Sequence, residues 1–274
     1  MVATRCGAAN NKILMYSHDL ATLRDSYNGG GTLGISNGAP TIQYRDSANN
    51  LVYVGVRDDG GESIVVLEVN STPAFNVPEY AVISGIGDID AGLAIAKKGS
   101  DRILVAGNTT GDVYVYNALV ASGGSLLSLD SCTVAGGCAQ SDGAVRGVAP
   151  GNSIAENALW VNWIVWTTDS KVHGIKLLGD GTFDEATYWT TSIASPSAPI
   201  VLRDVTGGND TYAYVGSSDG KLYEINATSG AVVRSWTVEA GTTIGTPTFD
   251  YNNGTNQGIV VGTTGGTYHW VKIN

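Results

Sequence analysis

Basic residues are scarce in this sequence, and so are charged residues of either sign. Only 15% of the 274 residues are charged, and Asp and Glu outnumber Lys and Arg by 25 to 15, which gives a formal net charge of −10. Binding to nucleic acid or to anionic lipid needs clusters of Lys and Arg, and the densest basic point is the pair Lys97-Lys98. The composition therefore argues against both kinds of partner.

Long apolar runs and histidines are also rare. No run approaches the roughly 18 apolar residues that a membrane-spanning helix requires, so we expect no membrane insertion. The three histidines, His18, His173 and His269, lie far apart and have no cysteine or histidine at ligand spacing. A zinc site is therefore not expected.

Cysteine is limited to three residues. Cys132 and Cys138 bracket a short Gly-rich segment that lets their Cα atoms approach, so we predict a disulfide between them. Such a bond indicates an oxidising compartment outside the cytoplasm; the alternative is two reduced, unpaired thiols. Cys6 is left over, either as a buried thiol or as the partner of a cysteine in another chain.

Glycine, by contrast, is abundant, with 37 residues, and it marks an internal repeat. Residues 107–118 (GNTTGDVYVYNA) and 216–227 (GSSDGKLYEINA) both read Gly, three polar residues, Gly, polar, apolar, Tyr, any residue, apolar, Asn-Ala. A third copy begins at residue 262 and a looser one at residue 55. Each is preceded by an apolar, β-branched run, at 51–54, 102–106, 211–215 and 258–261.

The repeat predicts an all-β protein whose short strands are joined by hairpins. A unit of three or four strands cannot bury both of its faces, whereas copies placed radially, face to face, cover one another. We therefore predict one β-propeller domain over residues 1–274, with six blades of about four antiparallel strands. Seven blades, or a β-sandwich, are the alternatives. The blades are expected at 35–83, 84–130, 140–192, 193–240 and 241–274, the last completed by residues from 1–34.

Two features indicate a contact surface. The segment 118–145 is interpreted as a long insert between the third and fourth units, and recognition collects in loops on a rigid scaffold; the alternative is a tolerated insertion. Trp160, Trp163 and Trp166 have a spacing of three, so on a strand they alternate between faces. An exposed Trp can stack on a sugar or anchor a protein partner; the alternative is packing between blades.

Two polar segments, 204–210 (DVTGGND) and 250–256 (DYNNGTN), keep the alternating spacing of a calcium-binding loop. Calcium needs several carboxylate and carbonyl oxygens. The candidate ligands are Asp204, Asp210, Asp250 and Asn252. The alternative is a polar turn in which Asp and Asn bond the backbone. Apart from calcium, no cofactor is expected.

Residues 212–236, YAYVGSSDGKLYEINATSGAVVRSW, closely resemble the repeat of quinoprotein-like (PQQ-type) β-propellers. The upstream halves of the units resemble FG-GAP repeats of integrin-type propellers, whose first hairpin carries an acidic loop, as at 87–96, 202–210 and 249–262. The resemblance covers about residues 35–274 and implies a propeller fold. PQQ dehydrogenases have eight blades and a vicinal disulfide over the cofactor, and this chain has no adjacent cysteines, so PQQ is not expected.

No motif typical of catalysis stands out. Two G-x-S-x-G strings occur, at 34–38 and 216–220. A nucleophile elbow requires a strand, a sharp turn and a helix, whereas the second string is the hairpin turn of the repeat. Carboxylates such as Asp88 and Asp90 sit in turns, whereas glycosidase carboxylates face one pocket from separate strands. We expect no enzyme.

These observations predict a non-enzymatic binding or adhesion module that is extracellular or at the cell surface. Its partner is expected to be a protein or a glycan, or other copies of itself in a pilus-like or filamentous assembly. Two alternatives remain open. One is a carbohydrate-active propeller enzyme with carboxylates at the mouth of its channel. The other is a structural subunit of an extracellular filament or surface layer.

Overall fold

A computed structural model provides the fold. It describes residues 2–5, 11–16, 20, 22–27, 33–34, 36, 38–44, 49–57, 61–70, 75–98, 101–118, 126–151, 162–203, 210–252 and 256–273. Within these ranges the chain forms 22 strands and no helix, as the repeat predicts. No helix that could cross a membrane occurs in these ranges.

The strands form six antiparallel sheets in chain order. The first contains β1 (Val2–Arg5), β2 (Lys12–Tyr16) and β3 (Leu23–Tyr27), and the second β4 (Thr41–Tyr44), β5 (Asn49–Gly55), β6 (Glu62–Asn70) and β7 (Phe75–Ser84). The third contains β8 (Ala94–Lys98), β9 (Asp101–Gly107), β10 (Val113–Asn117) and β11 (Ser128–Cys132). The fourth contains β12 (Gly147–Gly151), β13 (Trp163–Thr167), β14 (Lys171–Leu177) and β15 (Phe183–Ser192). The fifth contains β16 (Ile200–Arg203), β17 (Thr211–Gly216), β18 (Lys221–Asn226) and β19 (Val232–Thr237), and the sixth β20 (Thr248–Asn252), β21 (Asn256–Gly262) and β22 (Tyr268–Lys272).

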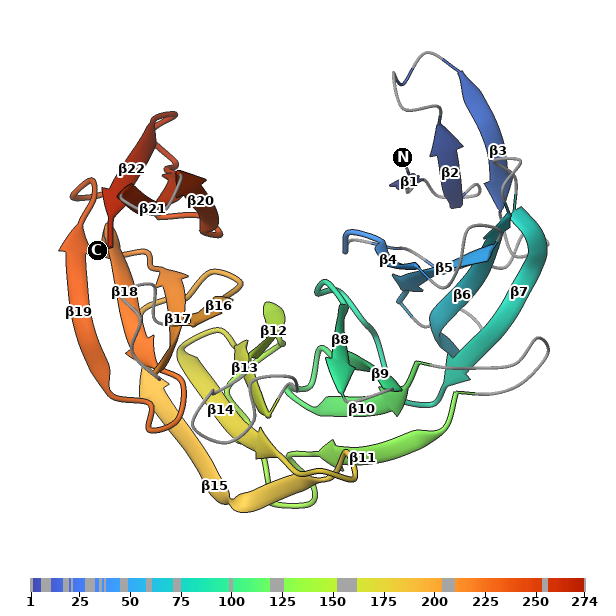
Figure 1. The fold of residues 1–274 in the computed structure, drawn as a ribbon, viewed down its shortest axis with the longest axis horizontal. Helices are drawn as coiled ribbons and strands as arrows, with labels where there is room; N and C mark the ends of the chain where they lie inside the picture. The colour runs from blue at the N-terminus through green and yellow to red at the C-terminus, as the bar shows by residue number, and fades with distance from the viewer. Residues whose placement is uncertain are drawn as a thin grey trace.

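The sheets follow one another around an arc, with the first strand of each four-stranded sheet inside and the fourth outside (Figure 1). Among the described residues, five hydrophobic clusters hold the arc together, one between each pair of consecutive sheets. Strand β13 shows how: Ile164 and Trp166 belong to the cluster shared with the third sheet, whereas Val165 belongs to the cluster shared with the fifth. Both faces of such a strand are buried, which explains its continuous apolar run.

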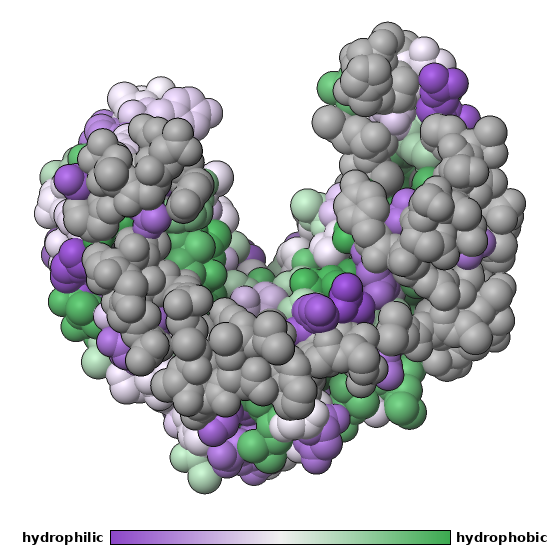
Figure 2. Space-filling view, viewed as in Figure 1, coloured by the Kyte–Doolittle hydropathy of each residue, from purple (hydrophilic) through white to green (hydrophobic). Residues whose placement is uncertain are grey.

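The first sheet corrects one expectation. Residues from 1–34 were expected to complete the last blade, but β1, β2 and β3 pair with one another and form a sheet of their own. In the described residues β22 pairs with β21 alone. The two ends of the arc, β1–β3 and β20–β22, stand apart on either side of an opening (Figures 1 and 2).

The segment 118–145 is the second correction. It is not one long insert, because it contains β11, which pairs with β10 as the fourth strand of the third sheet. Short strands with polar residues at most positions, such as SLDSC, lack the apolar run by which the other strands are recognised.

Candidate functional site

One end of the stacked sheets carries two kinds of connection, and we call it the turn face. Its tight turns join the second strand of a sheet to the third, and each is closed by a hydrogen bond from its first N–H to its last C=O, at 108–112, 168–171, 217–221 and 263–267. Its linkers join the fourth strand to the first strand of the next sheet, at 85–93, 133–146, 193–199 and 238–247. Turns and linkers contact each other through backbone hydrogen bonds from Ile89 N to Val56 O, Val145 N to Asn108 O and Ile244 N to Ser217 O, each 3.0 Å.

The glycines that open three copies of the repeat, Gly55, Gly107 and Gly216, are required by this contact. A Cβ on Gly107 would lie 2.3 Å from Cγ1 of Val145, and one on Gly216 would lie 2.6 Å from the carbonyl oxygen of Ile244. The linker residue is therefore seated against the glycine backbone, where a side chain would displace it. The constant spacing in the sequence reflects this close approach.

The fourth sheet has no glycine at the end of its second strand. Thr167 takes the glycine position at the end of its second strand and is fully buried, and its hydroxyl donates to Ser197 O at 2.9 Å. In the linker after this sheet, Pro196 takes the position that Val145 and Ile244 take in the linkers after the third and fifth sheets. Because a proline has no N–H, it cannot donate the hydrogen bond to the turn that those residues donate. Its neighbour Ser195 is exposed and adopts a φ of 41°, a left-handed conformation that is uncommon outside glycine.

A pocket of about 470 Å³ lies at this departure. It is lined by Arg146, Thr168, Asp169, Ser195, Pro196, Ser197, Ala198, Thr243, Ile244, Gly245 and Thr246. Arg146 donates from Nε to Asp169 Oδ1 at 2.7 Å, and both side chains are about half exposed. The other polar groups are uncharged hydroxyls, so the pocket offers hydrogen bonds and one solvated ion pair. Strained residues held at concave surfaces are typical of binding sites.

At the turn face, four sheets repeat a pairing of an aromatic side chain on the third strand with a carboxylate in a turn or linker. The pairs are Tyr114 Oη–Asp112 Oδ2 (3.4 Å), His173 Nε2–Asp142 Oδ2 (3.3 Å), Tyr223 Oη–Asp219 Oδ2 (2.6 Å) and His269 Nε2–Glu239 Oε2 (3.4 Å). The hydrogen bond to Asp219 raises the pKa of Tyr223 to about 12. Hydrogen bonds from Thr263 and Thr267 hold the pKa of Glu239 below its usual value.

His173 is the most buried member of this set, with 1% of its surface exposed. It stacks on Trp166 at 5.1 Å between ring centroids, and its Nδ1 lies 2.8 Å from Tyr188 Oη. Burial lowers its pKa to about 4; Lys171 adds to the effect and Asp142 opposes it. His173 is therefore a neutral imidazole at physiological pH.

The group does not have the geometry of a catalytic triad. A triad places the hydroxyl and the acid on opposite nitrogens of the imidazole. Here Thr168 Oγ1, at 3.0 Å, and Asp142 Oδ2, at 3.3 Å, both approach Nε2 of His173. His173 is also buried, so a substrate would not reach its imidazole. The arrangement fastens the linker that carries Asp142 to the fourth sheet.

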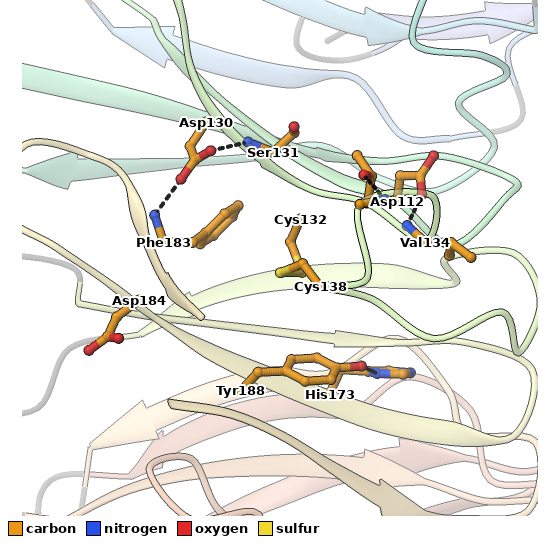
Figure 3. Close-up of a disulfide and its surroundings, with 12 residues drawn as sticks. Asp112, Asp130, Ser131, Cys132, Val134, Cys138, His173, Phe183, Asp184 and Tyr188 are labelled. Carbon is orange, nitrogen blue, oxygen red and sulfur yellow. Dashed lines mark hydrogen bonds between the residues drawn. A yellow bond between two sulfur atoms is a disulfide. The ribbon is translucent and has the colours of Figure 1, made fainter. Parts of the chain in front are cut away.

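The predicted disulfide lies in the same linker (Figure 3). The sulfurs of Cys132 and Cys138 are 2.09 Å apart and the Cα atoms 5.0 Å apart. Two carboxylates support the loop. Asp112 Oδ1 accepts from Val134 N at 2.7 Å, and Asp130 Oδ2 accepts from Phe183 N of the next sheet at 2.7 Å. The cystine therefore closes a loop that is bonded to the β9–β10 turn, and β11, which leads into it, is bonded to the fourth sheet.

The predicted tryptophan surface is not available in this structure. Trp163 is 4% exposed and Trp166 is fully buried, both on β13. Both faces of that strand are covered, so alternation along it exposes neither ring. Trp160 lies outside the described residues.

The predicted calcium loops are only partly described. Asp204 lies outside the described residues, and so do residues 253–255 between Asp250 and Asn256. Asp210 is exposed and accepts from Tyr212 Oη at 3.3 Å, while Asp250 accepts from Trp270 Nε1 at 3.0 Å. Asn252 ends β20. The described residues bring no group of three or more His, Cys, Asp or Glu side chains together as a metal site, and calcium binding stays a prediction.

The pocket residues were missed at the sequence level, although a signal existed. When the strand ends are compared, the fourth unit lacks the glycine and has Thr167 instead, and its turn, 168–171, is one residue shorter than the others. A repeat that loses its defining residue at one copy marks the place where that copy packs differently.

No protein-family model matches the sequence, and no curated protein is similar to it. Solved structures do share the fold. The chain is similar to BBS1N in complex with ARL6DN in a lead-soaked crystal, with 11% identity and a TM-score of 0.61 over 99% of this chain and 76% of that one. A mercury-soaked crystal of the same complex gives 13% identity and a TM-score of 0.57 over 97% and 73%. The WD40 β-propeller domain of Doa1 gives 10% identity and a TM-score of 0.51 over 97% and 76%. The chain has a β-propeller fold.

Proposed function

We propose that this protein is a non-enzymatic, protein-binding β-propeller that works outside the cytoplasm and holds its partner at the turn face. The observation that carries the proposal is the pocket at Ser195. It lies where one copy departs from the repeat, it is lined by hydroxyls and an ion pair, and it contains a residue with positive φ. A polar concave surface on a rigid sheet scaffold suits recognition of a polar protein loop.

The structural neighbours support this class of function by analogy. BBS1N was crystallised in complex with ARL6DN, so that protein binds a protein partner. At 11% identity the likeness concerns the fold, and a propeller fold hosts many functions. The local geometry of the turn face therefore has to identify the site.

The finer features of the proposal rest on the sequence. Six blades, one for each sheet, and a repeat of the PQQ or FG-GAP type are supported by the spacing of residues 107–118 and 216–227. An extracellular or cell-surface location is supported by the Cys132–Cys138 pair. A glycan ligand, calcium, adhesion and assembly into a filament belong to the same proposal.

The carbohydrate-active alternative has less support. A glycosidase needs two carboxyl groups roughly 5–10 Å apart across one site. Asp169 is the one carboxylate among the residues that line the pocket, and it is paired with Arg146.

Site-specific photo-crosslinking tests the proposal. A photoreactive residue at Ser195 is expected to capture a discrete protein in the native host. The same residue at Leu127, which is 65% exposed in the β10–β11 connection at the opposite end of the sheet, is the matched control. Thr246→Trp, which fills the pocket from an exposed position, should abolish the adduct. Identical products at Ser195 and Leu127, no adduct at Ser195, or an adduct that survives Thr246→Trp would each contradict the proposal.

A further inference from the structure

The last sheet differs from the four complete ones at its third strand. In the complete sheets the third strands β6, β10, β14 and β18 have a neighbour on both edges. Their outer neighbours are the fourth strands β7, β11, β15 and β19. Strand β22 takes the same place, but in the described part of the chain only β21 pairs with it.

The hydrogen bonds of β22 show which of its backbone groups face outward. Thr263 N donates to Thr267 O and Ile273 N donates to Gln257 O, so the odd-numbered residues from 267 to 273 exchange bonds with β21. Bonding alternates along an antiparallel pair. The N–H and C=O groups of Tyr268, Trp270 and Lys272 therefore point away from β21, along the open edge.

Side chains at this edge are large, apolar and exposed. Tyr268 is 84% exposed and Trp270 is 45% exposed. In β18 the equivalent residues, Leu222 and Glu224, are both fully buried, and Leu222 packs against Ile259 and Val261 of the next sheet. Trp270 lies flat over Gly258, whose added Cβ would be 2.3 Å from the indole, and its N–H is held by Asp250. The ring is fixed in place on an uncovered sheet face.

Strand β19 of the fifth sheet adjoins this position. Arg234 of β19 donates from Nη2 to Ile273 O at 3.1 Å, which brings β19 against the end of β22. On the same side of β19, Trp236 pairs with Leu222 and packs against the cluster that contains Ile259 and Val261 of the sixth sheet. Elsewhere in the arc the outer strands of neighbouring sheets contact each other, as β11 and β15 do. A strand placed on β22 would contact β19 in the same way.

We infer that the outer edge of β22 binds an extended segment of a partner protein, which adds to the sixth sheet as its fourth strand. The internal repeat defines the ligand, since four sheets of this chain carry an antiparallel strand at that position. The segment would exchange backbone hydrogen bonds with Tyr268, Trp270 and Lys272. Its alternate, apolar side chains would lie beside the two aromatic rings on the same face of the sheet. Strand addition of this kind takes affinity from main-chain bonds and specificity from alternate side chains.

A synthetic peptide with the sequence of residues 231–238, AVVRSWTV, serves as the probe because it contains a fourth strand of this chain. Hydrogen exchange is expected to slow at the amides of Tyr268, Trp270 and Lys272 when the peptide binds. The amides of His269 and Val271 are already bonded to β21 and should change little. The same peptide, N-methylated at alternate amides, should not bind.

Lys272→Pro removes one outward N–H and leaves the bonds to β21 intact, a change that edge strands tolerate. It should weaken peptide binding about tenfold, in line with the loss of a backbone hydrogen bond and a steric block. Lys272→Ala keeps the N–H and should bind the peptide as the wild type does. Unchanged exchange at His269 and Val271 confirms that the sheet of each variant is folded.

Several results would overturn the inference. They are no binding of the peptide at millimolar concentration, protection at sites other than β22, or equal affinity of the Lys272→Pro and Lys272→Ala variants. Self-association through β22 that the peptide does not inhibit would make a second copy the occupant instead. None of these outcomes affects the turn-face proposal, whose crosslinking site is on a different surface.

Discussion

At the scale of single residues, His173 connects burial to pH dependence. It stacks on Trp166, its Nδ1 lies 2.8 Å from Tyr188 Oη, and its Nε2 lies 3.3 Å from the carboxylate of Asp142. Its pKa in the folded protein is about 4, against an ordinary value of 6.5. The unfolded chain therefore binds a proton at His173 before the folded chain does as the pH falls. Its contribution to stability is complete above pH 6.5 and is lost between pH 6.5 and pH 4.

The first prediction is that the stability contributed by His173 falls as the pH is lowered. Between pH 7.5 and 4 the wild type should lose about 3 kcal/mol of unfolding free energy through His173, at about 1.4 kcal/mol per pKa unit. His173→Phe keeps the ring stack and removes the titration, so the variant should show a flatter dependence in urea unfolding across that range. Parallel curves for the wild type and His173→Phe would contradict the assignment.

At the scale of elements, the repeat glycine and the linker form the contact that sets the distance between sheets. A Cβ on Gly216 meets the backbone oxygens of Ile244 and Gly245 at 2.6 Å, and backbone atoms cannot rotate away as a side chain can. The fourth sheet makes this contact differently, with Thr167 in place of the glycine and Pro196 as the linker residue.

Gly216→Ala should therefore lower the unfolding free energy by about 2–3 kcal/mol, the cost of overpacking a rigid contact. For a chain of this length the melting temperature should fall by about 5–10 °C. Gly92→Ala is the matched control, because no heavy atom lies within 4 Å of the added Cβ. Equal melting temperatures for the two variants would show that the linker adapts at little cost.

The disulfide loop is a second element with a calculable effect. Cys132 and Cys138 are six residues apart, and closing so short a loop in the unfolded chain accounts for about 2 kcal/mol. The Cys132→Ala, Cys138→Ala double variant should fold and lose about that much in denaturant unfolding. Reduction of the wild type should give the same loss. A variant that fails to fold would show that the loop, with its bonds to Asp112 and the neighbouring sheets, depends on the cystine.

The sequence predicted the strands whose positions are set by local turn residues. It did not predict the strands whose positions are set by contacts with residues far away in the chain. Turn chemistry and a glycine seated against a linker placed β9, β10, β17 and β18, because spacing reports these contacts directly. Strand β11 was hidden inside 118–145, since its pairing with β10 and its bond from Asp130 to Phe183 are set by tertiary contacts. The separate first sheet and the burial of Trp163 and Trp166 depend on which sheet is the neighbour. The sequence of a single repeat unit does not identify that neighbour.

At the scale of the whole molecule, the six sheets form a one-dimensional stack. Each interior sheet is held by two hydrophobic clusters, one on each face, and each end sheet by one. In the described residues no cluster joins β20–β22 to β1–β3. Stability in such a stack is approximately a sum of units and nearest-neighbour interfaces. An end sheet can therefore open without the rest, whereas an interior sheet cannot.

Two equivalent deletions test this difference. Ile164 and Ile259 are both fully buried on second strands, in the cluster between the third and fourth sheets and in the cluster between the fifth and sixth. Ile→Ala at such a site costs about 2–5 kcal/mol. Ile164→Ala should lower the main thermal transition, because it breaks the stack in its middle. Ile259→Ala should leave that transition nearly in place and instead speed hydrogen exchange across β20, β21 and β22, because the sixth sheet has one interface to lose. If both variants shifted the main transition equally, the two ends of the arc would be joined in solution and the molecule would unfold as a closed ring.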